Sequence, residues 1–111
     1  MSETSAIVTP SIAAINATGL AFVFRCQAGL VKVRRAWMHL SPAGSPDVIG
    51  WMLDGSCRFV GIEAKVEGKK PSPEQEATRL RILAAGGVAG VAFSVTEAVD
   101  IIRAAARKEA A

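Results

Sequence analysis

Two carboxylates and a lysine are spaced so that they could form one catalytic site. Asp47 follows Pro46 at the start of an expected strand, and Glu63 and Lys65 flank Ala64 near the end of the next one. Residues two apart on a strand project from the same face, so Glu63 and Lys65 can point together toward Asp47. Two neighbouring carboxylates repel unless a cation lies between them, and oxygen ligands suit Mg²⁺ or Mn²⁺. The spacing therefore predicts a divalent metal site.

We expect this metal to be held by the carboxylates of Asp47 and Glu63 and by the backbone carbonyl of Ala64. Such an ion would polarise a scissile phosphate and lower the pKa of a bound water, while Lys65 orients that water or stabilises negative charge. The structural alternative is that Asp47 caps a turn after Pro46 and that Glu63 and Lys65 form an exposed charged strand edge. For Glu-x-Lys alone, this alternative is the better interpretation.

The elements that would position these residues follow from apolar spacing and turn residues. Strands are expected over residues 20–25 and within 30–40, paired antiparallel through a turn at 27–29, and from Asp47 to 52 and over 58–65. Asp54-Gly55 favours a tight hairpin turn between the last two strands, and this turn would bring Asp47 close to Glu63 and Lys65.

Three helices are expected around these strands. The first begins with Thr9 as N-cap and Pro10 in the first turn, directs Ile12 and Ile15 inward and stops at Gly19. The second runs over residues 73–85, with Ser72 as cap and Gln75 at the capping-box position, and is expected to bury Ala77, Leu80, Leu83 and Ala84. After Gly86-Gly87 and a covered strand at 88–94, Thr96 is expected to cap a last helix that buries Ala98, Ile101, Ile102 and Ala105.

This order predicts an α/β fold in which a mixed β-sheet is flanked by helices. The chain of 111 residues, half of them hydrophobic, is expected to form one domain over residues 1–111, with loosely held ends before about residue 8 and after Arg107. No run has the apolar length of a membrane span, and the start lacks the layout of a signal peptide, so a cytoplasmic protein is expected. Cys26, Cys57 and His39 are too few for a structural zinc site, and we interpret them as two reduced, mostly buried thiols and a structural histidine.

Several linked blocks of sequence resemble one nuclease family. They are Gly44-Ser-Pro-Asp-Val-Ile-Gly50, Phe59-Val-Gly-Ile-Glu-Ala-Lys65, Ser72-Pro-Glu-Gln75, Ala85-Gly-Gly-Val-Ala89 and Ser94-Val-Thr-Glu-Ala98. In this order, over about residues 20–102, the chain resembles the virus-type replication-repair nuclease family (VRR-NUC) of the PD-(D/E)xK nucleases. The resemblance implies a restriction-endonuclease-like core, a divalent metal held by Asp47 and Glu63, and a catalytic Lys65.

The resemblance also implies a role in the site for Gln75, and homodimers that cut branched DNA such as four-way junctions. A bacterial or phage origin would fit it. Gln75 has a second explanation as the capping-box residue after Ser72, and the two roles are compatible. The chain departs from the family pattern in two places. Its first helix carries no glutamate, only Glu3 preceding it, and Arg25-Cys26 stands where the family often has Arg-Asn. The first departure predicts weaker metal binding or a single-metal site.

Basic residues supply candidates for contacts to DNA phosphates. They are Arg25, Lys32, Arg34 and Arg35, in a stretch from Arg25 to Pro46 without a carboxylate, together with Lys69 and Lys70. Each could equally be a solvated surface residue. Trp37 and Trp51 could stack on bases, but we favour the core or a subunit interface for them.

The sequence is compatible with three functions to different degrees. A metal-dependent DNA endonuclease is favoured, and a catalytically inactive DNA-binding or scaffold module on the same fold is the alternative. An enzyme of small-molecule phosphates comes last, because no glycine-rich loop followed by Lys-Ser or Lys-Thr is present.

Overall fold

The computed structural model describes residues 4–26, 30–39 and 42–110. A π-helical turn, Thr4–Val8, leads into α1 (Thr9–Thr18), and α2 (Pro73–Ala84) and α3 (Val95–Ala110) follow later in the chain. The strands are β1 (Ala21–Arg25), β2 (Leu30–Val33), β3 (Ala36–His39), β4 (Val48–Met52), β5 (Phe59–Ala64) and β6 (Val88–Ala92).

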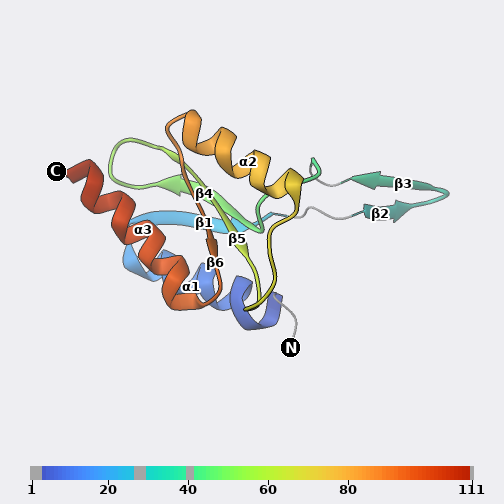
Figure 1. Ribbon diagram of the computed structural model, residues 1–111, viewed down its shortest axis with the longest axis horizontal. Helices are drawn as coiled ribbons and strands as arrows, with labels where there is room; N and C mark the ends of the chain where they lie inside the picture. The colour runs from blue at the N-terminus through green and yellow to red at the C-terminus, as the bar shows by residue number, and fades with distance from the viewer. Residues whose placement is uncertain (1–3, 27–29, 40–41, 111) are drawn as a thin grey trace.

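Four strands form a mixed sheet in the order β1-β4-β5-β6. β4 pairs antiparallel with both β1 and β5, whereas β5 and β6 are parallel and are connected through α2. α2 lies on one side of the sheet and α1 and α3 lie on the other (Figure 1). The expectation of an α/β fold with a mixed sheet flanked by helices is confirmed.

The hydrophobic core lies between the sheet and the pair α1 and α3. Its fully buried side chains include Ile15 from α1, Val23, Val60 and Ile62 from the sheet, and Ile102 from α3. A Cβ on Gly90 of β6 would lie 2.7 Å from Cδ1 of Ile101, so the absence of a side chain there lets α3 approach the sheet closely. None of the helices in the described ranges is long and apolar enough to cross a membrane.

The expected pairing of β1 with the next stretch of chain is wrong. β1 pairs with β4, from Ala21 opposite Met52 to Arg25 opposite Val48. β2 instead pairs antiparallel with β3, from Leu30 opposite His39 to Val33 opposite Ala36. A hairpin of its own results, and it extends away from the rest of the molecule (Figure 1). The expected turn at residues 27–29 lies outside the described residues.

Two helix caps differ from expectation. Thr9 is the first residue of α1 rather than its N-cap, because the π-helical turn runs directly into the helix and Val8 occupies the cap position without a side-chain hydrogen bond. At α3 the capping hydroxyl belongs to Ser94, whose Oγ accepts a hydrogen bond from Glu97 N at 3.1 Å, and not to Thr96. The predicted stop of α1 at Gly19 is confirmed, because that residue has the left-handed φ of 72°.

The side chains expected to be buried by α2 are exposed. Leu80 is 53% and Leu83 43% exposed, and Ala77 and Ala84 are exposed as well. The helix contacts the sheet through Ile82, whose Cδ1 lies 2.7 Å from where a Cβ on Gly61 would stand. α2 thus lies over β5 and β6, and the residues expected to face inward point mostly to solvent.

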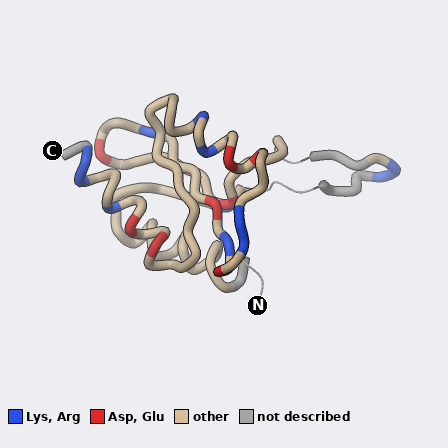
Figure 2. Tube along the Cα trace, viewed as in Figure 1, with Lys and Arg blue, Asp and Glu red and all other residues tan. Residues whose placement is uncertain are grey.

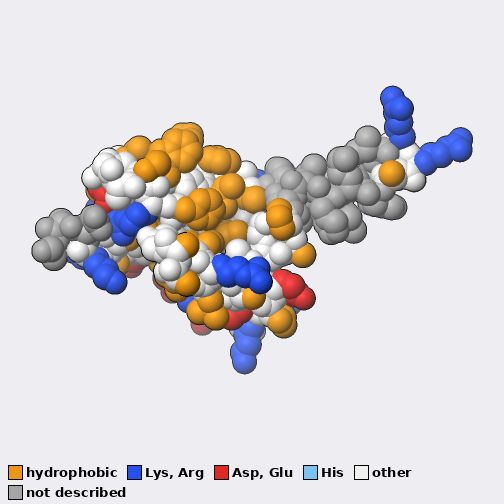
Figure 3. All heavy atoms as spheres, turned by 90° about the horizontal axis from the view of Figure 1, so that it is seen from above, with side chains coloured by type: hydrophobic (Ala, Val, Ile, Leu, Met, Phe, Trp, Pro, Cys, Tyr) orange, Lys and Arg blue, Asp and Glu red, His pale blue; other side chains and the backbone are white. Residues whose placement is uncertain are grey.

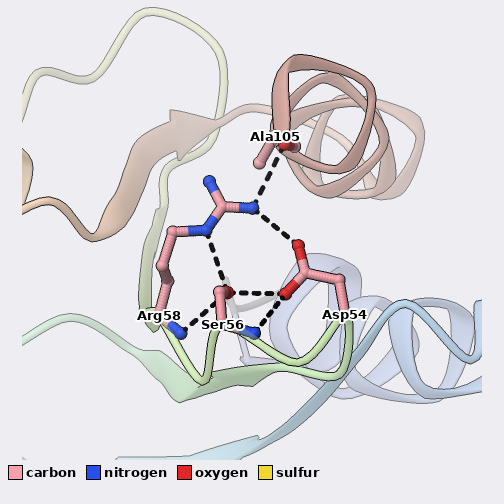
Figure 4. A network of polar contacts seen from close by, with 4 residues as sticks. All are labelled: Asp54, Ser56, Arg58 and Ala105. Atoms are coloured by element: carbon pink, nitrogen blue, oxygen red, sulfur yellow. Dashed lines mark hydrogen bonds and ion pairs between the residues drawn. The ribbon is translucent and has the colours of Figure 1, made fainter. Parts of the chain in front are cut away.

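The predicted hairpin at Asp54-Gly55 is confirmed, and it is tied to α3 (Figure 4). Ser56 donates to Asp54 Oδ1 through both its backbone N, at 3.0 Å, and its hydroxyl, at 2.5 Å. Arg58 Nη2 donates to Asp54 Oδ2 at 2.9 Å and to the Ala105 carbonyl at 3.2 Å. The bonds from Ser56, helped by the Arg58 charge, lower the pKa of Asp54 from 3.8 to about 2.

Candidate active site

Asp47 is joined to the end of β5 by a hydrogen bond. The β4–β5 register pairs Val48 with Ile62, so Asp47, one residue before β4, comes opposite Glu63 one step further along the ladder. The Oδ2 atom of Asp47 accepts a hydrogen bond from Ala64 N at 2.8 Å. The backbone carbonyl of Asp47 accepts another from Cys26 N, also at 2.8 Å. Two bonds therefore fix both the backbone and the carboxylate of Asp47.

Glu63 is a buried carboxylate that is hydrogen-bonded to α2. Only 7% of the residue is exposed, and its Oε1 accepts from Gln75 Nε2 at 2.8 Å. The amide oxygen of Gln75 accepts from Ser72 N at 2.8 Å, so its amide nitrogen must be the atom that points toward Glu63. The helix cap thus decides which way the Gln75 amide faces.

The capping role expected for Gln75 is confirmed, and the same side chain also contacts Glu63. Ser72 Oγ accepts from Gln75 N at 3.2 Å and Ser72 N donates to the Gln75 side chain, which is a complete capping box. The same side chain reaches Glu63 with its nitrogen. The predicted N-terminus of α2 is confirmed, and its cap contacts the carboxylate cluster.

The structural alternative for the carboxylates does not fit these contacts. Glu63 is buried rather than on an exposed edge. The Asp47 carboxylate bonds across to β5 and not to its own turn. A buried carboxylate costs free energy unless it is hydrogen-bonded or paired, and the bond from Gln75 offsets this cost for Glu63.

Lys65 continues the parallel ladder directly after β5. Its backbone N donates to the Ala92 carbonyl at 3.0 Å, and the residue is half-buried. This bond ties the end of β5 to β6 and fixes the backbone next to Ala64. Asp47, Glu63, Gln75 and the Lys65 backbone therefore meet at one end of the sheet.

Of the basic candidates, Arg25 lies beside the site, because it pairs with Val48, the residue after Asp47. Arg25 ends β1 and is exposed, and Lys69 and Lys70 are exposed in the connection from β5 to α2. Arg34 and Arg35 lie at the tip of the β2–β3 hairpin, far from the sheet (Figure 2). The side chains of Lys32, Trp37 and His39, and the whole of Glu3, lie outside what the structure describes.

An aromatic surface near the site was not recognised in the sequence. Phe22, Phe24 and Trp51 lie together on the side of the sheet that carries α2, with the rings of Phe22 and Trp51 5.2 Å apart and those of Phe24 and Trp51 6.5 Å apart. Trp51 is 40% exposed, so it is not a core residue. The alternation of small and aromatic residues in β1, Ala21-Phe-Val-Phe24, is the signal that could have indicated this second apolar face.

Beside this surface is a cavity of about 320 Å³. Its lining includes Pro46, next to Asp47, as well as Ile49, Phe59 and the half-buried Cys26. The expectation that both thiols are mostly buried is wrong for Cys57, which is exposed in the connection between β4 and β5. Cys57 has a positive φ of 56°, so it occupies a turn position rather than a strand.

The donor atoms at this end of the sheet are oxygens. The structure brings the Asp47 and Glu63 carboxylates to this end of the sheet, and oxygen ligands are the kind that Mg²⁺ and Mn²⁺ prefer. In the part of the chain that the structure describes, no group of three or more His, Cys, Asp or Glu side chains is placed to hold a metal. No family model matches the chain. No curated protein shows a significant match either.

Proposed function

We propose that this chain is a metal-dependent DNA endonuclease with a restriction-endonuclease-like core. The observation that supports the proposal is the juxtaposition of Asp47 and buried Glu63, which are held by hydrogen bonds from Ala64 N and from Gln75 Nε2. The resemblance of the blocks that contain these residues to the VRR-NUC family also favours it. A scaffold role alone would not require a buried carboxylate at this place.

The residues present fit a divalent ion. Asp47 Oδ2 is engaged by Ala64 N, but its carboxylate has a second oxygen and further lone pairs, as does that of Glu63. With the Ala64 carbonyl, these carboxylates would hold Mg²⁺ or Mn²⁺. When bound, the ion supplies Lewis acidity for the scissile phosphate and neutralises the two carboxylates.

The other roles in the proposed reaction belong to groups of the chain itself. Gln75 keeps Glu63 in one position through a bond whose direction is set by the helix cap. Ala64 N holds Asp47 across the hairpin. The Lys65 ammonium, on a backbone anchored to Ala92, orients the attacking water or stabilises negative charge on the phosphate. Positioning of this kind lowers the barrier by reducing reorganisation during the reaction.

Branched DNA and a second copy of the chain are the proposed partners. The aromatic surface of Phe22, Phe24 and Trp51, with Leu53 and Phe59, exposes roughly 400 Å² of apolar area. This is about half of the roughly 800 Å² that each subunit brings to a standard interface, so the contact would extend beyond these five side chains. Light scattering should give a dimeric mass for the wild type and a monomeric mass for Trp51→Lys.

The experiment that tests the activity compares the wild type with Lys65→Ala and Asp47→Asn. Each protein is incubated with a four-way junction and with a linear duplex of matched sequence, in Mg²⁺, in Mn²⁺ and in chelator. We expect metal-dependent cleavage, faster on the junction, that both substitutions abolish. Binding of DNA without cleavage by the wild type would contradict the nuclease and identify a DNA-binding module. Equal cleavage by the variants would show that the site lies elsewhere.

A further inference from the structure

The β2–β3 hairpin is a two-stranded ribbon separate from the main sheet. Its four paired positions run from Leu30 opposite His39 to Val33 opposite Ala36, and Arg34 and Arg35 form the turn. The ribbon accounts for the elongated shape of the molecule, whose extents are 52 × 30 × 24 Å (Figure 1). Two-stranded hairpins are at most marginally stable alone in water, so this one would gain by lying against another surface.

The base of the ribbon is the candidate active site. Cys26 N donates to the Asp47 carbonyl at 2.8 Å. The chain therefore leaves the main sheet at Cys26 and returns to it at Asp47, whose carboxylate accepts from Ala64 N. Arg34 follows Cys26 by eight positions (34 − 26). A fully extended chain of that length spans at most roughly 29 Å. The ribbon tip therefore lies within that distance of Cys26, which is bonded to the backbone of Asp47.

The ribbon segment carries positive charge and no carboxylate. From Cys26 to Pro46 the sequence contains Lys32, Arg34 and Arg35 and no Asp or Glu. Both arginines of the turn are exposed, and their side chains extend outward from the end of the ribbon (Figure 3). A partner with dense negative charge matches this segment, and the DNA backbone carries one charge per roughly 1.7 Å of helix axis.

The residue at the first central position of the turn is unusual for a hairpin. Arg34 has a φ of 58°, whereas Arg35 has no positive φ, and this combination is typical of a turn that favours glycine at its first central position. A non-glycine residue adopts a positive φ only at a cost in free energy. The arginine at position 34 is therefore unfavourable for the backbone of this turn, whereas its charge favours binding of an anion.

We propose that the ribbon seats in a groove of double-stranded DNA, with Arg34 and Arg35 on backbone phosphates. The major groove, about 12 Å wide and 8.5 Å deep, admits a two-stranded ribbon. At 3.4 Å per base pair, a reach of roughly 29 Å places these contacts up to about eight base pairs from Cys26, beside the candidate site. The inference rests on the proposed function in taking DNA as the substrate, and it assigns the ribbon a positioning role on one duplex arm.

The test removes the charges without disturbing the turn. Arg34→Gly with Arg35→Ser suits a turn that has positive φ at its first central position, and Arg34→Lys with Arg35→Lys is the matched control that keeps both charges. Binding to a 30-base-pair duplex is measured in chelator over a series of salt concentrations, so cleavage does not enter. We expect the Gly-Ser variant to bind about tenfold or more weakly at low salt. Its slope of log affinity against log salt should fall by about 1.8, which corresponds to two phosphate contacts. The Lys-Lys variant should stay close to the wild type.

The outcomes test the DNA contact of the ribbon separately from the nuclease activity. If the Gly-Ser variant binds with unchanged affinity and salt slope, the ribbon does not contact DNA, whatever the cleavage result. If it also becomes monomeric where the wild type is dimeric, the ribbon is a subunit contact and the proposal is overturned. If the wild type never cleaves but the salt slope falls as expected, the nuclease fails and the ribbon contact stands. Thermal melting of the variants at the wild-type temperature confirms that the fold is kept.

Discussion

Gln75 donates its amide hydrogen to Glu63 while its amide oxygen accepts from Ser72 N, so one side chain both caps α2 and orients a buried carboxylate. The two bonds depend on each other, since reversal of the amide would place two acceptors together at Glu63. The stability of the helix start and the geometry of the candidate metal site are therefore linked through a single residue.

This link predicts different effects for Gln75→Ala and Ser72→Ala. Both substitutions remove capping bonds, and loss of the Ser72 hydroxyl should lower the free energy of unfolding by about 1 kcal/mol. Gln75→Ala also removes a donor from buried Glu63, which should cost roughly a further 1.5–3 kcal/mol. Urea denaturation measures both. The Mg²⁺ concentration for half-maximal cleavage should rise in Gln75→Ala alone, and equal stability losses in the two variants would argue against the Glu63 contact.

Asp47→Asn and Asp47→Ala should both abolish cleavage but differ in stability. An asparagine retains a carbonyl oxygen that can accept from Ala64 N, whereas an alanine leaves that buried N–H without its 2.8 Å partner. An unsatisfied buried donor costs roughly 1–3 kcal/mol, so the alanine variant should unfold at lower urea concentration by that amount. Equal midpoints for the two variants would mean that the Ala64 bond contributes nothing to folding.

The elements that the sequence predicted well are those decided by neighbouring residues. Ser72, Pro73 and Gln75 specify a helix start within four positions, and Asp54-Gly55 specifies a turn. In the same way, Asp47 was placed next to β4 because the Pro- and Gly-containing loop must end there. Local hydrogen bonds and φ preferences are enough for such features.

Two features, the pairing of β1 with β4 and the contact of Gln75 with Glu63, could not be predicted from neighbouring residues because they depend on the whole fold. β1 was expected to pair with the next strand, but Arg34-Arg35 lacks the residues of a recognisable turn, so the separate ribbon was not foreseen. Leu80 and Leu83 have the spacing of a buried helix face, yet α2 contacts the sheet through Ile82. Which face of a helix is covered depends on elements distant in sequence, and so does the bond between Gln75 and Glu63.

Asp54 should make stability depend on pH at the acid end. Its bonds to Ser56 and Arg58 lower its pKa to about 2 from 3.8, so the folded protein binds this proton less readily than the unfolded chain. The contribution is fully present above about pH 4 and is lost as the pH falls through about 2. Melting temperatures recorded between pH 5 and pH 2 should therefore fall less steeply in Asp54→Asn than in the wild type. Ser56→Ala, which removes the hydroxyl donor, should lie between them, and parallel curves for all three would exclude this contribution.

Gly61 allows α2 to lie against β5, and its replacement should disturb both stability and activity. A Cβ at Gly61 would lie 2.7 Å from Cδ1 of Ile82 and 2.9 Å from Cγ of Pro46, so Gly61→Ala must shift the end of the Ile82 side chain and the Pro46 ring. Overpacking of this kind costs roughly 1–3 kcal/mol, and cleavage should fall because Pro46 directly precedes Asp47. Ile82→Val removes the Cδ1 atom and alone should cost about 0.5–1.5 kcal/mol. The double variant should be more stable than the sum of the two losses implies, by roughly 1 kcal/mol in a urea double-mutant cycle. Additive losses would place the strain at Pro46 instead, because that contact is unchanged by the substitution at Ile82.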